Sequence, residues 1–168
     1  MSALLDEALG LKGLARAGWG RVGIDNPESV AAHAWGVCWL VVAHAPSDMD
    51  TERALKIAVV HDLIEVRVGD ITPHDGISRT EKSTRETQAA QSMFSDRPDL
   101  LDLWQEYEDN LSAEAQFVHD CDKLDMALQA LRYAREQGVD TSEFIQSARR
   151  KIQHPALLDV LNAQQPSR

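Results

Sequence analysis

Cysteine is nearly absent: the 168 residues contain two, Cys38 and Cys121. Two cysteines in apolar segments with helical spacing are typical of small core residues and exclude a disulfide framework. Long hydrophobic runs are also missing, since the longest, residues 39–43, falls far short of the about 20 residues that span a bilayer. The first residues lack the basic region and cleavage pattern of a signal peptide. We therefore expect a cytoplasmic protein with no membrane partner.

Basic residues are in the minority. The sequence has 17 Lys and Arg against 27 Asp and Glu, a formal net charge of −10 at pH 7. Because binding to a nucleic-acid backbone needs a basic surface, this balance argues against nucleic acid as a partner. A small phosphate ester remains possible if a local basic pocket overrides the overall field. There is no Gly-rich phosphate loop, catalytic Ser motif or CxxC pair.

Apolar residues recur at steps of three or four through most of the chain. This spacing predicts an all-α protein of six to eight helices with no convincing strand. The length fits one domain over residues 1–168. Asn26 and Pro27 predict the start of one helix, with Asn as the N-cap and Pro in the first turn. The expected helices cover residues 26–45, about 50 to 69, 79–94, 99–109, 112–138, 141–152 and 156–163.

The most informative string is the apolar run at residues 59–65, which contains His61 next to Asp62. A charge in such a run is costly unless a partner or a metal ion neutralises it. His33 lies in an upstream helical segment and Asp122 in a downstream one. Two imidazole nitrogens and two carboxylate oxygens suit one borderline divalent ion, with positions left open for water and substrate. Asp120 is the rival for the fourth position, on a different face of its helix.

The polar face around Asp122 has a second interpretation. Asp122, Asp125, Gln129 and Arg132 recur at steps of three or four beside an apolar stripe, which in an isolated helix predicts a solvated face. The need of the two histidines for a further ligand favours Asp122 as part of a metal site. His44, His74 and His119 are weaker candidates, and a second metal ion would need such ligands.

Several residues near the His-Asp pair have side chains suited to catalysis. Glu65 follows His61 by four residues, so in a continuous helix both project from the same face. A carboxylate beside a metal ion can hold a water in line or accept its proton. Asp70 lies in a Gly-Asp turn, Arg16 could clamp a phosphate, and Trp19 could pack under a base. Taken singly, these residues are also typical of a surface acid, a turn aspartate, a solvated charge and a surface anchor.

With this ordered set of residues, the chain resembles the HD-domain metal-dependent phosphohydrolases, and more narrowly the branch that acts as 5′-deoxynucleotidases. The resemblance covers about residues 10–163 and implies a single HD-domain helical bundle. The segments that carry it are Arg16-Ala17-Gly18-Trp19, Pro27-Glu28-Ser29-Val30-Ala31-Ala32-His33, Val60-His61-Asp62-Leu63-Ile64-Glu65, Val68-Gly69-Asp70-Ile71-Thr72-Pro73, Glu81-Lys82, Arg85-Glu86, Ser112-Ala113-Glu114-Ala115, Asp122 and Lys151-Ile152-Gln153-His154-Pro155.

The resemblance implies hydrolysis of deoxyribonucleoside 5′-monophosphates to deoxynucleoside and phosphate. It also implies a divalent cobalt, manganese or similar ion, and a homodimer. Glu65 and Asp70 would be catalytic or substrate-contacting acids. Arg16 matches an Arg-x-Gly-Trp variant of the phosphate clamp, while Arg21 could reach the same phosphate. The implied metal ligands are His33, His61, Asp62 and Asp122.

Two other functions stay open. One is hydrolysis of another small nucleotide or phosphate ester by the same fold. The other is a non-catalytic regulatory module that binds a metal or a nucleotide. The presence of Glu65 and Asp70 beside the four ligands favours catalysis, because a metal-stabilised module does not need them.

Overall fold

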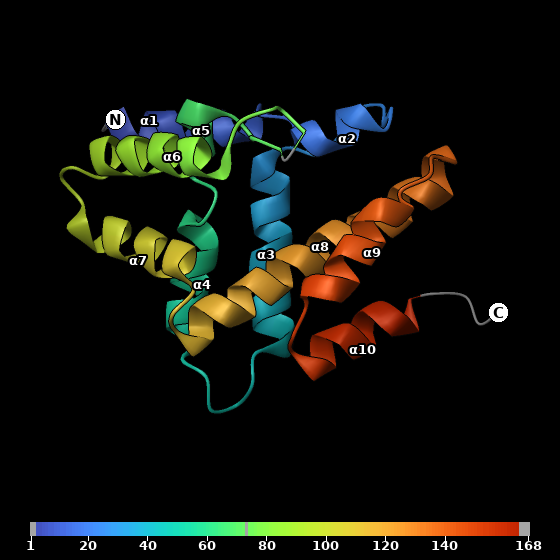
Figure 1. The fold of residues 1–168 in the computed structure, drawn as a ribbon. Coiled ribbons are helices and arrows are strands. Elements are labelled where there is room, and N and C mark those ends of the chain that lie inside the picture. The colour runs from blue at the N-terminus through green and yellow to red at the C-terminus, as the bar shows by residue number, and fades with distance from the viewer. Residues whose placement is uncertain (1–2, 73, 165–168) are drawn as a thin grey trace.

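The computed structural model describes residues 3–72 and 74–164, and these residues form an all-α fold (Figure 1). Seven of its helices have nine residues or more, which agrees with the six to eight expected. In the described part of the chain there is no strand, only an isolated bridge between Ala15 and Ser29. The elements are α1 (Ala3–Ala8), the 3₁₀ helix η1 (Leu9–Lys12), α2 (Ala17–Arg21), α3 (Val30–His44), α4 (Thr51–Val60), α5 (Glu65–Val68), α6 (Arg79–Met93), α7 (Pro98–Asp109), α8 (Ala113–Gln137), α9 (Ser142–Lys151) and α10 (Pro155–Ala163).

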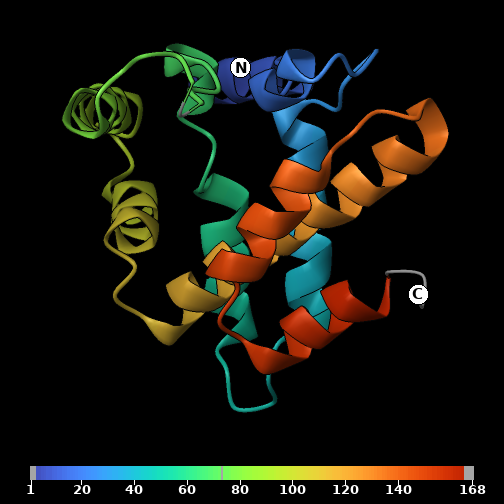
Figure 2. The ribbon, with the colours of Figure 1, turned by 45° about the vertical axis from the view of Figure 1, so that its right-hand side comes forward.

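The 25-residue helix α8 runs diagonally through the molecule and organises the core (Figures 1 and 2). Helices α3, α4, α9 and α10 all pack against it. The largest cluster of buried apolar side chains lies along these contacts and includes Val37, Ile57 and Leu124. A second cluster joins α6 and α7 to the end of α4, and a third surrounds Trp19. Burial of these stripes holds the helices in place.

Side chains with an oxygen near the backbone start several helices at the expected places. Asp50 accepts a hydrogen bond from the Arg53 amide, and Ser112 accepts one from the Ala115 amide. Gly138 ends α8 in the left-handed conformation with φ of 70°, as glycine commonly does at this position. Local capping chemistry therefore predicts both ends of the longest helix.

The predicted start of α3 at Asn26 is wrong. The helix begins at Val30, and Ser29 is its N-cap, with its side chain accepting from the Ala32 amide. Asn26 instead adopts a left-handed turn with φ of 49°. The cause is a contact with another segment of the chain: the Glu28 carbonyl accepts a hydrogen bond from the Arg16 amide, which keeps this stretch out of the helix.

The expected continuous helix through residues 50–69 is also wrong, because it breaks after Val60. The Leu63 amide donates to the Val60 carbonyl at 3.1 Å and the Glu65 amide to the Asp62 carbonyl at 3.0 Å, which are the bonds of a tighter turn. The short helix α5 follows from Glu65. An apolar run has the same spacing in either conformation, so periodicity alone does not reveal this turn.

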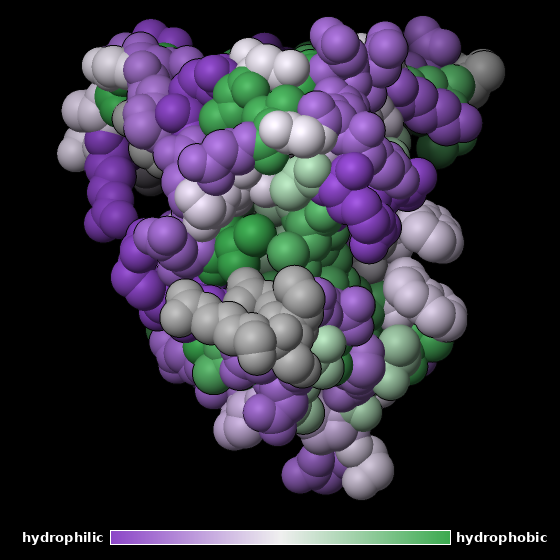
Figure 3. Space-filling model, turned by 90° about the vertical axis from the view of Figure 1, so that its right-hand side faces the viewer, coloured by the Kyte–Doolittle hydropathy of each residue, from purple (hydrophilic) through white to green (hydrophobic). Residues whose placement is uncertain are grey.

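Helix α3 contains no Asp, Glu, Lys or Arg, and one of its faces is exposed. Val37 and Val41 are fully buried, whereas Trp35, Trp39 and Val42 are 71%, 56% and 57% exposed. Hydrophobic residues also reach the surface on the face beside the end of α10, where hydrophilic residues surround them (Figure 3). Among the described residues, no helix has both the length and the apolar character needed to cross a membrane.

Candidate active site

A cavity of about 560 Å³ opens between the turn after α4, the α6–α7 pair, and helices α8 and α9. Eight of the nine site residues predicted from the sequence line this cavity. His33 lies directly behind the wall, with its ring fully buried. The candidate residues that line the cavity are Arg16, Trp19, Arg21, His61, Asp62, Glu65, Asp70 and Asp122.

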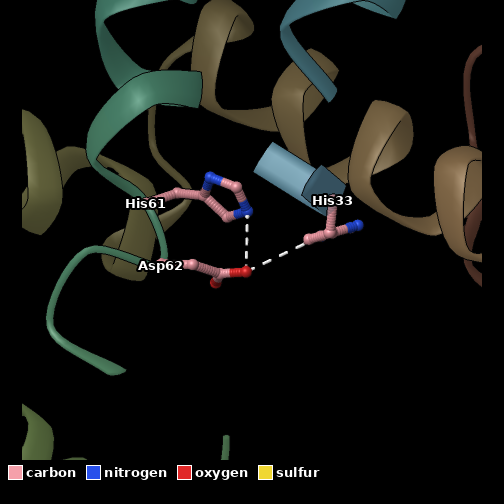
Figure 4. A group of neighbouring side chains, drawn as sticks. All are labelled: His33, His61 and Asp62. Carbon is pink, nitrogen blue, oxygen red and sulfur yellow. Dashed lines mark ion pairs between the residues drawn. The ribbon is translucent and has the colours of Figure 1, made fainter. Parts of the chain in front are cut away.

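Three elements bring the expected metal ligands together. Asp62 Oδ2 lies 3.2 Å from His61 Nε2 and 3.6 Å from His33 Nε2, so both rings point at one carboxylate oxygen (Figure 4). Asp122 of α8 reaches the same ring, with Oδ1 3.3 Å from His33 Nε2. The tight turn after Val60 directs the Asp62 side chain toward His33 of α3. Asp62 therefore contacts both His33 and its sequence neighbour His61.

The chemistry of the two imidazoles fits a divalent metal ion. Both Nε2 atoms are buried and have no hydrogen-bond partner among the described residues. Both Nδ1 atoms are engaged, at 2.7 Å from Asp125 Oδ2 for His33 and 2.7 Å from the Ala58 carbonyl for His61. Because these oxygens accept, each Nδ1 carries a proton, and in the neutral ring Nε2 presents its lone pair. Ligand atoms of His33, His61 and Asp62 all lie within 4.8 Å of one another.

Asp122 has one oxygen held and the other directed to the site. Its Oδ2 accepts hydrogen bonds from Lys123 Nζ at 2.6 Å and from the Tyr107 hydroxyl at 3.1 Å. Burial alone would raise the pKa of Asp122, but the Lys123 ammonium and the nearby imidazoles hold it well below its usual range. The carboxylate is therefore charged and oriented, as metal coordination requires.

The two candidate phosphate clamps lie in different surroundings. Arg16 Nη1 is 3.3 Å from Asp62 Oδ2, and its Nε is 3.9 Å from Asp70 Oδ2. Asp70 Oδ2 also accepts from the Ala17 amide at 2.8 Å, which fixes the loop that carries Arg16. Arg21 instead forms an ion pair with Glu143 of α9 at a more exposed position. Of the two arginines, Arg16 therefore lies at the cluster of predicted ligands.

Glu65 is buried at the cavity wall, and no described residue forms a hydrogen bond with its Oε2. Burial, together with the charges of Asp62 and Asp70, raises the pKa of Glu65 to about 10. Without a metal ion this carboxyl holds a proton at neutral pH. A divalent cation beside Asp62 would offset the repulsion, so Glu65 is suited to exchange a proton with a bound molecule.

Trp19 is part of the cavity wall rather than an exposed platform. The side chain is 1% exposed and packs against Phe144 at 4.5 Å and Tyr133 at 5.2 Å between ring centroids. Its Nε1 donates to Glu28 Oε1 at 3.1 Å. Phe144 lines the same cavity and is less buried. Phe144 is therefore the more accessible of the two aromatic side chains in the cavity wall.

Sequence reasoning missed several residues of the site. The sequence contains some indication of Asp125 and Lys123, because Asp125 follows Asp122 by about one helical turn and Lys123 is adjacent to Asp122. Nothing in the sequence indicated that α9 forms a wall of the cavity, since a polar stripe on a short helix is usually solvated. His74 and His119 line the cavity too, whereas His44 is not among its described lining residues. The lining residues from α9 are Glu143, Phe144, Ser147, Arg150 and Lys151.

The family model described as HD domain matches residues 9–158. The chain belongs to this family. The 5′-deoxynucleotidase hdd1 of Schizosaccharomyces pombe is 38% identical over 163 residues, which cover 90% of this chain and 82% of that protein. The 5′-deoxynucleotidase HDDC2 of Xenopus laevis is 34% identical over 160 residues, covering 91% and 80%. A solved structure from Pyrococcus horikoshii superposes with a TM-score of 0.81 at 34% identity and 97% coverage of both chains.

Proposed function

We propose that this HD-domain protein is a metal-dependent 5′-deoxynucleotidase that releases phosphate from deoxyribonucleoside 5′-monophosphates. The observation that carries the proposal is a pair of buried imidazole Nε2 atoms that meet Asp62 at the wall of the cavity. Neither atom has a hydrogen-bond partner in the part of the chain that the structure describes. The cavity also contains basic side chains, although the chain as a whole has a net charge of −10. Relatives that share about a third of their residues with this chain carry the same activity in their names.

The metal site in this proposal consists of His33, His61, Asp62 and Asp122. Two nitrogens and two oxygens suit one borderline divalent ion such as cobalt or manganese. When bound, such an ion supplies Lewis-acid stabilisation of phosphate charge and lowers the pKa of water. The buried, oriented donors are the contribution of the protein.

The remaining residues bind the phosphate and move protons. Arg16 and Lys123 border the predicted metal ligands and are placed to neutralise the phosphate oxygens. Asp70 holds the loop of Arg16. Glu65 accepts a proton from the attacking water while the oxygen of that water forms a bond to phosphorus. The bond from phosphorus to O5′ then breaks, and the leaving oxygen takes up a proton, which Glu65 can return.

A phosphate-release screen tests this function. Metal-free protein is supplied with manganese, cobalt, zinc or magnesium and with 5′-deoxyribonucleotides, 5′-ribonucleotides, 3′-deoxyribonucleotides and a simple aryl phosphate. We expect metal-dependent release that favours the 5′-deoxyribonucleotides. Preference for another phosphate ester would favour the first alternative function. Metal binding without release from any ester would favour a regulatory module.

The phosphate clamp gives a separable prediction. Arg16→Lys is expected to raise the KM or lower the kcat for monophosphates by about 10-fold or more, because Lys does not reproduce the planar fork of Arg. Metal affinity should change little, since Arg16 donates no ligand atom. Arg21→Lys is the matched control and should have a much smaller effect, because Arg21 already pairs with Glu143. The reverse order of effects in steady-state kinetics would assign the clamp to Arg21.

A homodimer is part of the same proposal, and the exposed face of α3 supports it. A helix that is apolar all round is normally buried, yet Trp35 and Trp39 are largely exposed in the single chain. Light scattering should give twice the mass of one chain, and Trp35→Glu should give a monomer. A monomeric wild-type protein would contradict this part. The cytoplasmic location and the single domain over residues 1–168 stay predictions from the sequence.

A further inference from the structure

Gly36 leaves a space in α3 close to His33. A Cβ at this position would lie 2.7 Å from Asp125 Cγ, and nearer still to its Oδ1, a separation that real side chains do not adopt. Gly36 lies within the helix and is not among the glycines with positive φ, so the backbone does not require glycine here. Glycine inside a helix is less favourable than alanine. What glycine provides at position 36 is therefore the space for the Asp125 carboxylate.

The carboxylate in this space contacts His33. Asp125 Oδ2 lies 2.7 Å from His33 Nδ1, and the His33 ring is fully buried. A carboxylate oxygen accepts, so Nδ1 is the donor, and Nε2 is the nitrogen that offers a lone pair when the ring is neutral. His61 achieves the same result differently, through the Ala58 carbonyl of its own helix. Of these two rings, His33 is thus the one whose Nδ1 hydrogen bond is made to a side chain of another helix.

We propose that Asp125 is a positioning residue for the metal site and that Gly36 is what allows it to reach His33. Asp125 keeps the proton on Nδ1 and turns Nε2 toward Asp62 and Asp122. This inference rests on the proposed metal site. Carboxylates that hold a ligating histidine in this way typically change metal affinity by about 10–100-fold.

Glu28 provides an alternative explanation of the same geometry. Ligand atoms of Glu28, His33 and Asp125 lie within 4.8 Å of one another, so a second ion could bind them. Two contacts favour positioning instead. The separation of His33 Nδ1 and Asp125 Oδ2 is that of a hydrogen bond, and Glu28 Oε1 already accepts from Trp19. Binding stoichiometry distinguishes the two explanations.

The test is a double-mutant cycle read by calorimetric titration of the metal-free full chain with Mn²⁺. Asp125→Ala and Gly36→Ala should each weaken binding about 10–100-fold. The double variant should bind no more weakly than Asp125→Ala, because the carboxylate that the new methyl group displaces is gone. It should also melt at a higher temperature than Asp125→Ala, since alanine favours the helix. Asp125→Asn, which keeps an accepting oxygen, should recover part of the affinity.

Several outcomes would overturn the inference: wild-type affinity in Asp125→Ala, additive losses in the double variant, or loss of one of two bound ions. Glu136→Gln, which removes an exposed charge from the same helix, is the control and should bind as the wild type does. His33→Ala separates the inference from the proposed function. If His33→Ala retains the affinity, the metal site itself is wrong. If His33→Ala loses it while Asp125→Ala does not, only the positioning role is wrong.

Discussion

His61→Ala is expected to abolish both tight metal binding and phosphate release. The His61 side chain is buried, and within residues 3–72 and 74–164 its Nε2 has no hydrogen-bond partner. Its removal leaves Asp62 without the imidazole that faces it at 3.2 Å. The loss of metal affinity should be larger than about 10–100-fold, which is the usual effect of removing a residue that only supports a metal ligand. Elemental analysis after dialysis and a phosphate-release assay measure the two effects.

His44→Ala is the matched control for this variant. His44 ends α3 outside the cavity, so its removal should leave the metal content and turnover unchanged. A melting curve shows whether His61→Ala still folds, and Asp62→Asn gives a variant of nearly the same size if it does not. Stoichiometric metal retained by folded His61→Ala would remove His61 from the predicted ligand set.

Glu65→Gln is expected to lower kcat by about 10²–10⁴-fold, the usual contribution of a positioned general base. The metal content should stay at the wild-type level, because Glu65 is outside the cluster of His33, His61 and Asp62. Glutamine keeps the shape of the buried side chain, so the change removes the exchangeable proton with little effect on packing. Steady-state kinetics with a saturating metal concentration give the change in kcat.

Glu86→Gln provides the comparison for Glu65. Glu86 lines the same cavity from α6 and is equally buried, and burial is the main cause that raises its pKa. Unlike Glu65, it forms an ion pair with Lys82 at 3.4 Å. Its substitution should change kcat far less. Near wild-type turnover in Glu65→Gln, or equal losses in both variants, would contradict a specific role for Glu65 in proton transfer.

The helices of this protein were predictable where local chemistry decides them. Ser112 and Gly138 delimit α8 in both the prediction and the structure, because capping involves only neighbouring backbone groups. Asn26 shows the limit of such reasoning. It has good capping chemistry, but the pairing of Glu28 with Arg16 displaces the helix start to Ser29, and that contact joins two separate segments.

The candidate ligands were recognisable because unpaired polar groups are unusual in apolar helical segments. His33, the His61-Asp62 pair and Asp122 are polar groups of this kind. The break after Val60 was not recognisable, since an apolar run looks alike in a helix and in a tight turn. That break is what turns Asp62 toward His33 and leaves Glu65 on the cavity wall.

The helical fold and a set of candidate residues for the site followed from the sequence, because periodicity and capping are properties of short segments. Distances between segments were set only when the helices packed. Packing placed Arg16 rather than Arg21 beside Asp62, brought the polar face of α9 to the cavity, and set Asp125 into the space at Gly36. Each of these contacts joins residues far apart along the chain, and their geometry depends on how side chains of separate helices fill a shared volume.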